Sequence, residues 1–380
     1  MNKLKIYLHF ILFLLLFGCK KDEPFVDIPP VSTHRSVLVY LGADNNFRAE
    51  ARQKIEQLRS GWDKDIDGNL LVYADAGDSP VWVHIYHSSR KGNVADTIAV
   101  YPAENSARPE TLRRMINKLQ EDYPAESYGL VVLSHATGWV PADMSLPTIA
   151  LRSVILDRGT VDPDNYMELS AFADAIPYKL DFMVFDACFM GSVEVAYELK
   201  DKTDYIVASP SEVLVPGFVY PTMMQHLFRA QLDLTAVARE FYEYYDAQKG
   251  ISRSATVSVV KTSGLDALAA FTGELPTPTG SNDNLINSVQ HFGYGQQKIY
   301  FDFGDYIQKL APERYDEFQA ILNQCVGYKA STPSYYSEGT SSLKAISSFS
   351  GLSVYIPQAN YPVLNEWYKT LEWYKAVSKQ

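Results

Sequence analysis

Continuous apolar runs alternate with helix-like spacing along the first 250 residues of the chain. Most of these runs have the length and composition of strands that are buried on both faces of a sheet. Predicted strands cover 36–41, 69–74, 81–86, 128–134 and 181–185, and predicted helices cover 48–58 and 111–119. Strands that alternate with helices indicate a mostly parallel central sheet with helices on both faces, which is a three-layer αβα sandwich.

The pattern is less regular after residue 250. Strands are predicted there at 256–260 and 351–356, and helices at 265–271 and 365–377. We therefore expect a first folded region at 35–250 and an additional C-terminal region, 251–380, packed on it. Between the strands at 128–134 and 181–185, segment 139–166 contains three prolines and is predicted to be a long surface excursion.

The N-terminus has the features of a secretory signal at residues 1–18. Lys3 and Lys5 precede an apolar run that is shorter than the roughly 20 residues needed to span a bilayer. The sequence Leu16-Phe-Gly-Cys19 resembles a bacterial lipobox, which implies that Cys19 carries a lipid. Residues 19–34 contain three prolines and no regular period, so they are predicted to be a tether. Ordinary secretion with an unmodified Cys19 is the alternative.

Composition and charge exclude several classes of function. The 380 residues are 47% hydrophobic and 21% charged, which is typical of a globular protein. The net charge is −11 and no basic run is longer than two residues, so nucleic acid is not an expected partner. Three cysteines, Cys19, Cys188 and Cys325, are too few for a disulfide framework. We find no metal-ligand spacing and predict no metal cofactor.

Two predicted strands end in residues that can carry out nucleophilic catalysis. His135 follows the strand at 128–134, and Cys188 follows the strand at 181–185. If these strands are neighbours, the imidazole can help to form the reactive thiolate. The backbone N–H groups after His135 and at Cys188 could then hold a tetrahedral oxyanion. Taken singly, each residue also has a structural interpretation. Cys188 could be a small buried thiol, and His135 could be a hydrogen-bonded polar residue at a strand end.

The segments around these two residues resemble a known family. His135-Ala-Thr-Gly-Trp139 resembles the His-Gly-x-Gly-Trp motif of the clostripain family of cysteine peptidases (clan CD). Asp186-Ala-Cys-Phe-Met-Gly191 with Glu194-Val-Ala-Tyr-Glu-Leu199 is similar to the nucleophile block of that family. The resemblance implies a caspase-like fold and a Cys188/His135 dyad that forms an acyl-enzyme with a protein or peptide substrate. It also implies cleavage after Arg or Lys, with the Asp186 carboxylate in the specificity pocket.

The chain departs from the family pattern at two places. Ala136 replaces the glycine whose backbone N–H faces the oxyanion, and alanine carries strain there if the position needs a positive φ. A weakly active or inactive relative that binds peptides or partner proteins is therefore an alternative, and a cysteine hydrolase acting on other amides is another. Segment 216–220 also lacks the acidic residue of many relatives, which weakens the expectation of a basic preference.

The resemblance also suggests a processing site and a location. Arg152 and Arg158 lie in the excursion between His135 and Cys188, where self-cleavage could activate the protein. The lipobox places the protein in the cell envelope, anchored to a membrane by lipid. We expect the outer membrane of a Gram-negative bacterium, with secretion as the alternative.

The remaining candidates have structural explanations. Cys325 is predicted to be a buried thiol, and His84 and His87 are predicted to be structural. Several polar residues close predicted strands and could line a cleft or hold calcium, to which some relatives respond, although turn formation explains them equally well. These residues are Asp44, Asn45, Asp75 and Asp78.

Overall fold

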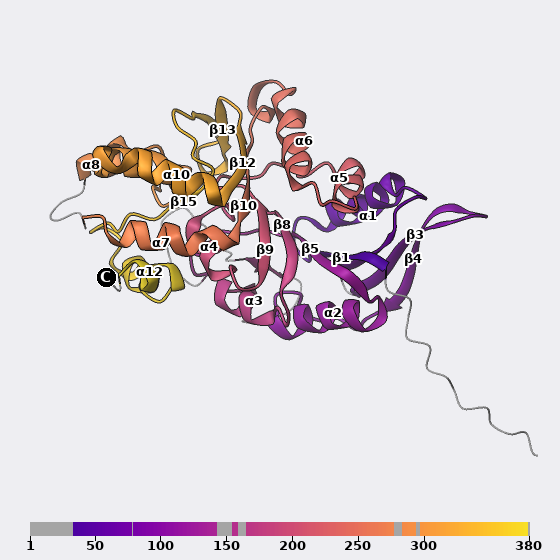
Figure 1. Cartoon of the computed structure of the whole chain (residues 1–380). Coiled ribbons are helices and arrows are strands. Elements are labelled where there is room, and N and C mark those ends of the chain that lie inside the picture. Colours follow the sequence, from indigo (N-terminus) through magenta and orange to yellow (C-terminus); the bar gives the residue numbers. More distant parts are fainter. Residues whose placement is uncertain are drawn as a thin grey trace, which may run out of the picture. The chain divides into compact units, whose positions relative to one another are not determined.

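The computed structural model describes residues 33–77, 79–142, 154–158, 165–276, 283–293 and 297–378. These residues form a nine-stranded sheet in the order β12-β10-β9-β8-β5-β1-β2-β3-β4 (Figure 1). Its strands are β1 (Thr33–Gly42), β2 (Gly68–Asp75), β3 (Val81–Ser88), β4 (Gly92–Val100), β5 (Ala125–Leu133), β8 (Leu180–Asp186), β9 (Thr203–Ala208), β10 (Thr256–Lys261) and β12 (Val326–Ser331).

The centre of the sheet is parallel and its two margins are antiparallel. Strands β2, β1, β5, β8 and β9 run in one direction. Strands β3 and β4 on one side, and β10 and β12 on the other, pair antiparallel to their neighbours. Eight of the ten residues of β1 are buried, because helices cover both faces of the sheet. The predicted mostly parallel sheet is confirmed.

Helices form a layer on each face of the sheet (Figure 1). Their apolar side chains fall into two separate large clusters, one on each side. One layer contains α1 (Arg48–Gly61), α5 (Tyr220–Leu227) and α6 (Leu234–Asp246). The other layer includes α2 (Pro109–Asp122), α3 (Leu169–Ala175), α4 (Val193–Glu198), α7 (Leu265–Gly273), α10 (Tyr315–Cys325) and α12 (Glu372–Val377). The three-layer αβα sandwich is therefore confirmed.

The other described elements are short. The helices are α8 (Asp283–Ser288), α9 (Phe303–Leu310) and α11 (Pro362–Tyr368). The strands, which pair two by two outside the main sheet, are β6 (Ile155–Leu156) with β7 (Tyr166–Met167), β11 (Phe301–Asp302) with β15 (Ser353–Val354), and β13 (Ser334–Ser337) with β14 (Ser342–Ala345).

Helix α2 illustrates how the sequence pattern produces a layer. Leu112, Met115, Ile116 and Leu119 recur at spacings of three and four residues and are all buried against the sheet. Each such side chain contributes about 1.5–3 kcal/mol when it leaves water. Pro109 occupies the first helical position, where a missing N–H costs no helical hydrogen bond.

Residues after 250 share the sheet with the residues before it. Strand β10 pairs with β9, and β12 extends the sheet beyond β10. One compact unit begins at Ser32 and includes the predicted C-terminal region. The position predicted as a boundary, residue 250, thus lies inside this unit.

Three element boundaries differ from the prediction. The single helix predicted at 365–377 is wrong, because Leu371 is extended and separates α11 from α12. Tyr368 and Trp373 are both buried, whereas five residues along one continuous helix would turn them about 140° apart. The strand predicted at 351–356 is reduced to β15. Strand β1 begins at Thr33, so it includes the last two residues of the predicted tether, 19–34.

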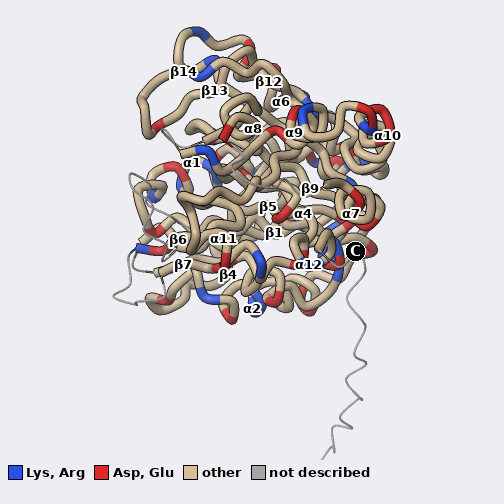
Figure 2. The backbone as a smooth tube through the Cα atoms, turned by 90° about the vertical axis from the view of Figure 1, so that its left-hand side faces the viewer, with Lys and Arg blue, Asp and Glu red and all other residues tan. Residues whose placement is uncertain are grey.

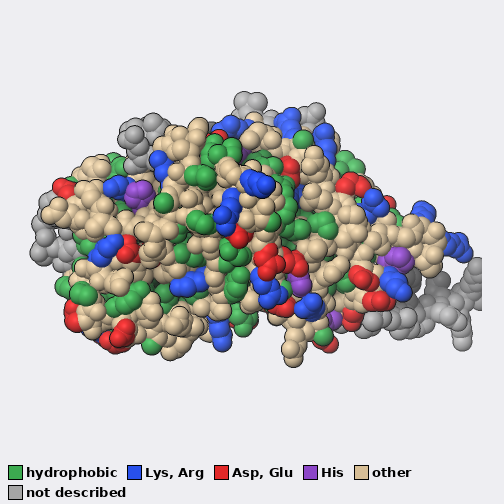
Figure 3. All heavy atoms as spheres, turned by 90° about the horizontal axis from the view of Figure 1, so that it is seen from above, with side chains coloured by type: hydrophobic (Ala, Val, Ile, Leu, Met, Phe, Trp, Pro, Cys, Tyr) green, Lys and Arg blue, Asp and Glu red, His purple; other side chains and the backbone are tan. Residues whose placement is uncertain are grey.

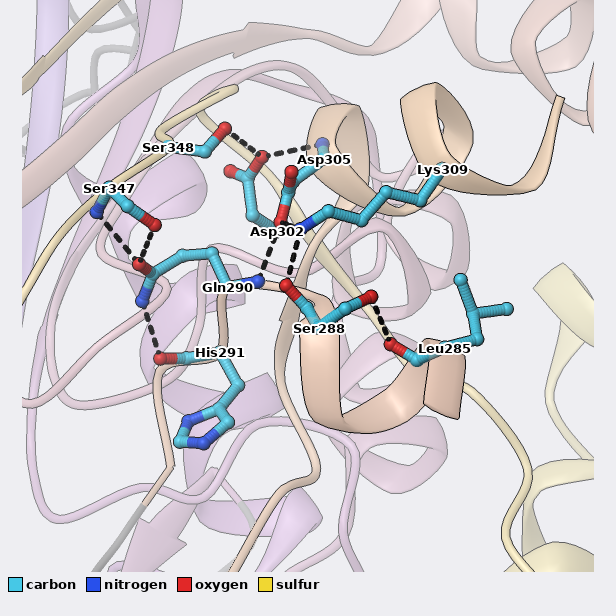
Figure 4. Close-up of polar contacts among 9 residues, drawn as sticks. All are labelled: Leu285, Ser288, Gln290, His291, Asp302, Asp305, Lys309, Ser347 and Ser348. Carbon is cyan, nitrogen blue, oxygen red and sulfur yellow. Dashed lines mark hydrogen bonds and ion pairs between the residues drawn. The ribbon is translucent and has the colours of Figure 1, made fainter. Parts of the chain in front are cut away.

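A polar network ties the segment before β15 to the start of α9 (Figure 4). Asp302 accepts hydrogen bonds from the Ser348 hydroxyl (3.0 Å) and from the backbone N–H of Asp305 (2.9 Å). The Asp305 carboxylate accepts from the Gln290 N–H (2.6 Å) and from Lys309 Nζ (2.7 Å). These hydrogen bonds compensate the carboxylates for the loss of water, so the network has a structural role.

Charged side chains of both signs are interspersed over the surface. Figure 2 shows Lys and Arg positions among Asp and Glu positions on the helices of that view. In α2, Lys118 and Asp122 pair at 2.5 Å. Figure 3, which views the side of α5 and α6, shows hydrophobic side chains between charged ones. No helix in the described ranges has both the length and the apolar character needed to cross a bilayer.

Candidate active site

His135 and Cys188 lie at the same edge of the sheet. Strands β5 and β8 pair in parallel, with Leu133 opposite Asp186. His135 and Cys188 each follow two residues after that pair, so both lie beyond the carboxyl ends of adjacent strands. Ligand sites of open α/β sheets occur at this edge. The structure therefore brings together the two residues that the sequence suggested as a catalytic pair.

The imidazole of His135 is oriented by the loop after β1. Its Nε2 lies 2.6 Å from Asn46 Oδ1, and its ring stacks on Phe47 with the centroids 4.0 Å apart. The amide oxygen is an acceptor, which favours the tautomer with the hydrogen on Nε2. Since β1 is the neighbour of β5, the loops after two adjacent strands position this ring.

The thiol of Cys188 is partly buried and contacts the loop after β9. The backbone N–H of Val213 donates to Sγ at 3.3 Å. Sγ also lies 3.9 Å from the carbonyl oxygen of Val213, so Val213 offers the sulfur both a donor and an acceptor. The next residue, Phe189, has φ of 60°, and its N–H bonds the carbonyl of Ser211. A left-handed conformation at a non-glycine residue stores strain and is often found at functional sites.

Ala136 is not in the left-handed region. Among the described residues, only Phe189 and Ser341 are non-glycine residues with positive φ. The glycine that this loop needs is Gly138, at φ 63°, where an added Cβ would lie 2.5 Å from the carbonyl oxygen of Phe189. The strain expected for alanine at position 136 is therefore wrong. The physical reason for an inactive relative disappears with it.

A small pocket of about 20 Å³, which is room for about one water molecule, opens beside Cys188. Glu50, Asp186 and segment 213–217 contribute to its lining. Asp186 is only 5% exposed, and its Oδ1 accepts a hydrogen bond from the Phe218 N–H at 3.3 Å. Burial raises the pKa of Asp186 to about 6, against the opposing effects of the Lys54 ammonium and the Tyr220 hydroxyl.

Lys54 lies next to this pocket, and the sequence pattern did not single it out as a functional residue. Its side chain is completely buried and donates to the carbonyl oxygens of Pro216 and Phe218. The sequence contains a sign of this role, because the spacing of Ala51, Lys54 and Leu58 places the lysine on the buried face of α1. A cation on an apolar stripe needs buried acceptors, which points to a polar site beneath the helix.

Tyr300, from the region after residue 250, connects the loops of His135 and Cys188. Its ring stacks on Phe189, with the centroids 4.5 Å apart, and its hydroxyl donates to the carbonyl of Thr137 at 2.7 Å. The indole N–H of Trp367 donates to the Trp139 carbonyl at 3.0 Å. The C-terminal region thus contributes groups that hold the loop of His135. No pattern in the sequence indicated these contacts.

The other strand-end residues have structural partners. Asp44 pairs with Arg48, and the Asn45 amide donates to the carbonyl of Leu156 at 2.9 Å. Asp75 is buried, and burial together with the neighbouring Asp157 raises its pKa to about 8. Asp78 lies outside the described residues. Within those residues, no group of three or more His, Cys, Asp or Glu side chains is arranged to hold a metal ion.

The remaining histidines and the third cysteine lie away from this edge. His84 packs against the rings of Tyr86 and Tyr123, and His87 Nδ1 lies 2.8 Å from Asn93 Oδ1. Cys325 is fully buried in α10, and burial raises the pKa of its thiol to about 11. All three agree with the predicted structural roles.

The predicted processing and lipidation residues are only partly described. Cys19 and Arg152 lie outside the described residues, as does the predicted signal, 1–18. Arg158 is exposed, and its backbone N–H donates to the carbonyl of Asp44 at 2.7 Å. Residues 154–157, which precede it, are all buried.

Comparisons with known proteins agree on one family. The model of the clostripain family matches residues 39–380. Clostripain from Hathewaya histolytica is 26% identical over 223 residues, which make up 50% of this chain but only 42% of that protein. A solved inactive zymogen C11 protease from Parabacteroides distasonis is 35% identical, with a TM-score of 0.80 over 92% of this chain and 99% of that chain. A secreted C11 cysteine protease from Bacteroides thetaiotaomicron, solved with an irreversible peptide inhibitor, is 28% identical, with a TM-score of 0.79 over 90% and 98%.

Replacing Tyr300 with Phe tests whether this residue positions the catalytic loops. The Tyr300→Phe variant keeps the ring but loses the bond to the Thr137 carbonyl, and we expect kcat for a peptide substrate to fall roughly tenfold. Tyr178→Phe is the matched control, since its hydroxyl donates to the Ile116 carbonyl at 3.1 Å, away from the site. Both variants should lose about 1 kcal/mol of unfolding free energy in urea titrations. Equal effects on kcat would contradict the positioning role.

Proposed function

The chain belongs to the clostripain family of cysteine peptidases, and we propose that it is an endopeptidase that uses a dyad of Cys188 and His135. The observation that carries the proposal is the register of β5 and β8, which places both residues at one edge beside a pocket. The hydrogen bond from the Val213 N–H to Sγ adds support, because it holds the sulfur at this edge of the sheet.

The chemistry follows from these positions. The Cys188 thiolate attacks the carbonyl carbon of the scissile bond, and the backbone N–H groups of Ala136 and Cys188 stabilise the oxyanion that forms. His135 gives a proton to the departing amine, so the peptide bond breaks and a thioester remains on Cys188. Water then hydrolyses the thioester, which releases the acyl product and regenerates the thiol.

The acidic lining of the pocket beside Cys188 matches the charge of a basic residue on the acyl side of the cut, and the pocket would have to widen to admit that side chain. Asp186 supplies a carboxylate there, although it is buried and its pKa is raised by burial to about 6. Above that pH the carboxylate is ionised and attracts the cation of an Arg or Lys side chain. We therefore assign Asp186 to substrate binding.

We place the protein in the cell envelope. Residues 1–18 would direct export, Cys19 would carry the lipid, and the residues that follow would link the lipid to the folded part. One similar protease is described as secreted, which fits export of this chain. Anchoring in the outer membrane of a Gram-negative bacterium is the specific form of this proposal.

We also propose that the protein is made as a precursor and cuts itself after Arg152 or Arg158. The similarity to a zymogen supports a precursor form. Cleavage after Arg158 would require the buried residues 154–157 to leave their places and the bond from Arg158 to the Asp44 carbonyl to open.

Replacement of the dyad residues tests the peptidase directly. We expect Cys188→Ala to abolish hydrolysis of fluorogenic peptides and His135→Ala to lower kcat/KM by roughly 10²- to 10⁴-fold. Cys325→Ala and His84→Ala are the controls and should keep activity, since both residues lie away from this edge. Hydrolysis that survives in Cys188→Ala would refute the mechanism.

The processing proposal predicts the masses of the chains. A Cys188→Ala precursor should remain a single polypeptide in intact-mass spectrometry, because it cannot cut itself. An Arg152→Ala/Arg158→Ala double variant should also remain whole and show at least tenfold lower peptidase activity. Normal cutting and full activity in that variant would refute self-cleavage at these arginines.

The lipid anchor predicts a partition experiment. In a Gram-negative host, the wild-type protein should enter the detergent phase of a Triton X-114 separation, because an acylated Cys19 adds a large apolar group. A Cys19→Ala variant should move to the aqueous phase, while Cys325→Ala should partition like the wild type. Identical partition of Cys19→Ala and wild type would refute lipidation.

A further inference from the structure

Three charged side chains meet in and beneath the pocket beside Cys188. Glu50 and Lys54 project from α1, and Asp186 ends β8. Lys54 Nζ lies 3.5 Å from Glu50 Oε1 and 4.1 Å from the centroid of the Tyr220 ring. We name Glu50, Lys54 and Asp186 the charge triad.

The triad is bound to the backbone of the same pocket wall. Lys54 donates to the carbonyls of Pro216 and Phe218, and the N–H of Phe218 donates to Asp186. Gly217 between them has φ of 74°, and an added Cβ would lie 2.2 Å from Asp186 Oδ1. Segment 216–218, which forms this wall of the pocket, therefore packs directly on the triad, and little water separates the three charges.

The carboxylates of the triad outnumber its cation. Two carboxylates and one ammonium add up to a net charge of −1. Glu50 Oε1 and Asp186 Oδ2 are both buried, and the Tyr220 hydroxyl faces the Asp186 carboxylate. A charge in such a dry setting acts strongly on a ligand, because the local dielectric constant is low. One positive charge from a substrate would make the site neutral.

We propose that Glu50 and Lys54, together with Asp186, determine the side-chain preference of this pocket through their net charge. Glu50 adds the second carboxylate that attracts an Arg or Lys side chain, and Lys54 limits the excess negative charge to one. This inference rests on the proposed peptidase function and names the residues that set its specificity.

The acidity of Asp186 gives the preference a pH dependence. The groups that face its carboxyl are Glu50 and Lys54 from α1, Tyr220 from α5 and Tyr245 from α6. Because burial raises the pKa of Asp186 to about 6, protonation below that pH makes the triad neutral. The preference for a basic residue should therefore weaken as the pH falls through about 6, and it should be fully present above it.

The test compares four proteins, which have three different triad charges, at pH 8. The measured quantity is the ratio of kcat/KM for two peptides that differ only in having Arg or Met on the acyl side of the cut. Lys54→Met leaves a charge of −2, the wild type and Glu50→Gln/Lys54→Met have −1, and Glu50→Gln has 0. We expect the ratio to follow that order, with steps of roughly tenfold per charge.

Glu56→Gln is the matched control. Glu56 lies on the same helix but is exposed and pairs with Arg59, so this variant should give the wild-type ratio.

Thermal unfolding of each variant checks folding. The double variant matters here, because Glu50→Gln leaves a buried ammonium without its carboxylate, whereas the double variant removes both charges. Should Glu50→Gln not fold, the rise in Lys54→Met and its reversal in the double variant still test the proposal.

The outcomes separate this inference from the proposed function. A ratio that follows triad charge supports the inference. Cleavage of both peptides with the same ratio in all folded variants overturns the inference and leaves the peptidase function standing. If the wild type cleaves neither peptide, both fall together.

Discussion

The parallel pairing of β5 with β8 is the constraint on which the candidate site depends. With Leu133 opposite Asp186, His135 and Cys188 emerge at equal heights from neighbouring strands. A register shift of one residue would move one of them by about 3.3 Å and turn its strand's side chains to the other face. The buried apolar residues on both faces of β8 oppose such a shift. The packing of the core therefore also maintains the relative positions of His135 and Cys188.

The C-terminal region completes the frame around this edge. The Glu194 carboxylate, in the helix that follows the Cys188 loop, accepts a hydrogen bond from the Tyr355 N–H at 2.7 Å. Glu194 is fully buried, and this burial raises the pKa of its carboxyl to about 7. Together with the contacts of Tyr300 and Trp367, this bond attaches residues after 250 to the loops of both His135 and Cys188. The two regions of the sequence therefore form one functional unit.

The sequence predicted the central strands well, because strands buried on both faces have a long apolar signal. It also made His135 and Cys188 the leading candidates, since each closes such a strand and lies in a distinctive motif, and the structure places both at one edge of the sheet. It did not predict the break at Leu371 or the role of Tyr300, because both depend on contacts between residues far apart in the chain. The concern about Ala136 was wrong for a related reason. Backbone conformation in a loop depends on its surroundings, and Gly138 takes the left-handed position there.

The order of the strands has a consequence for the integrity of the molecule. Strand β5 precedes the excursion at 139–166 and β8 follows it, yet the two are hydrogen-bonded neighbours in the middle of the sheet. A chain nicked within that excursion would thus consist of two polypeptides that share one hydrophobic core. The halves would separate on a denaturing gel but travel as a single particle in gel filtration, with the imidazole carried by one polypeptide and the sulfur by the other.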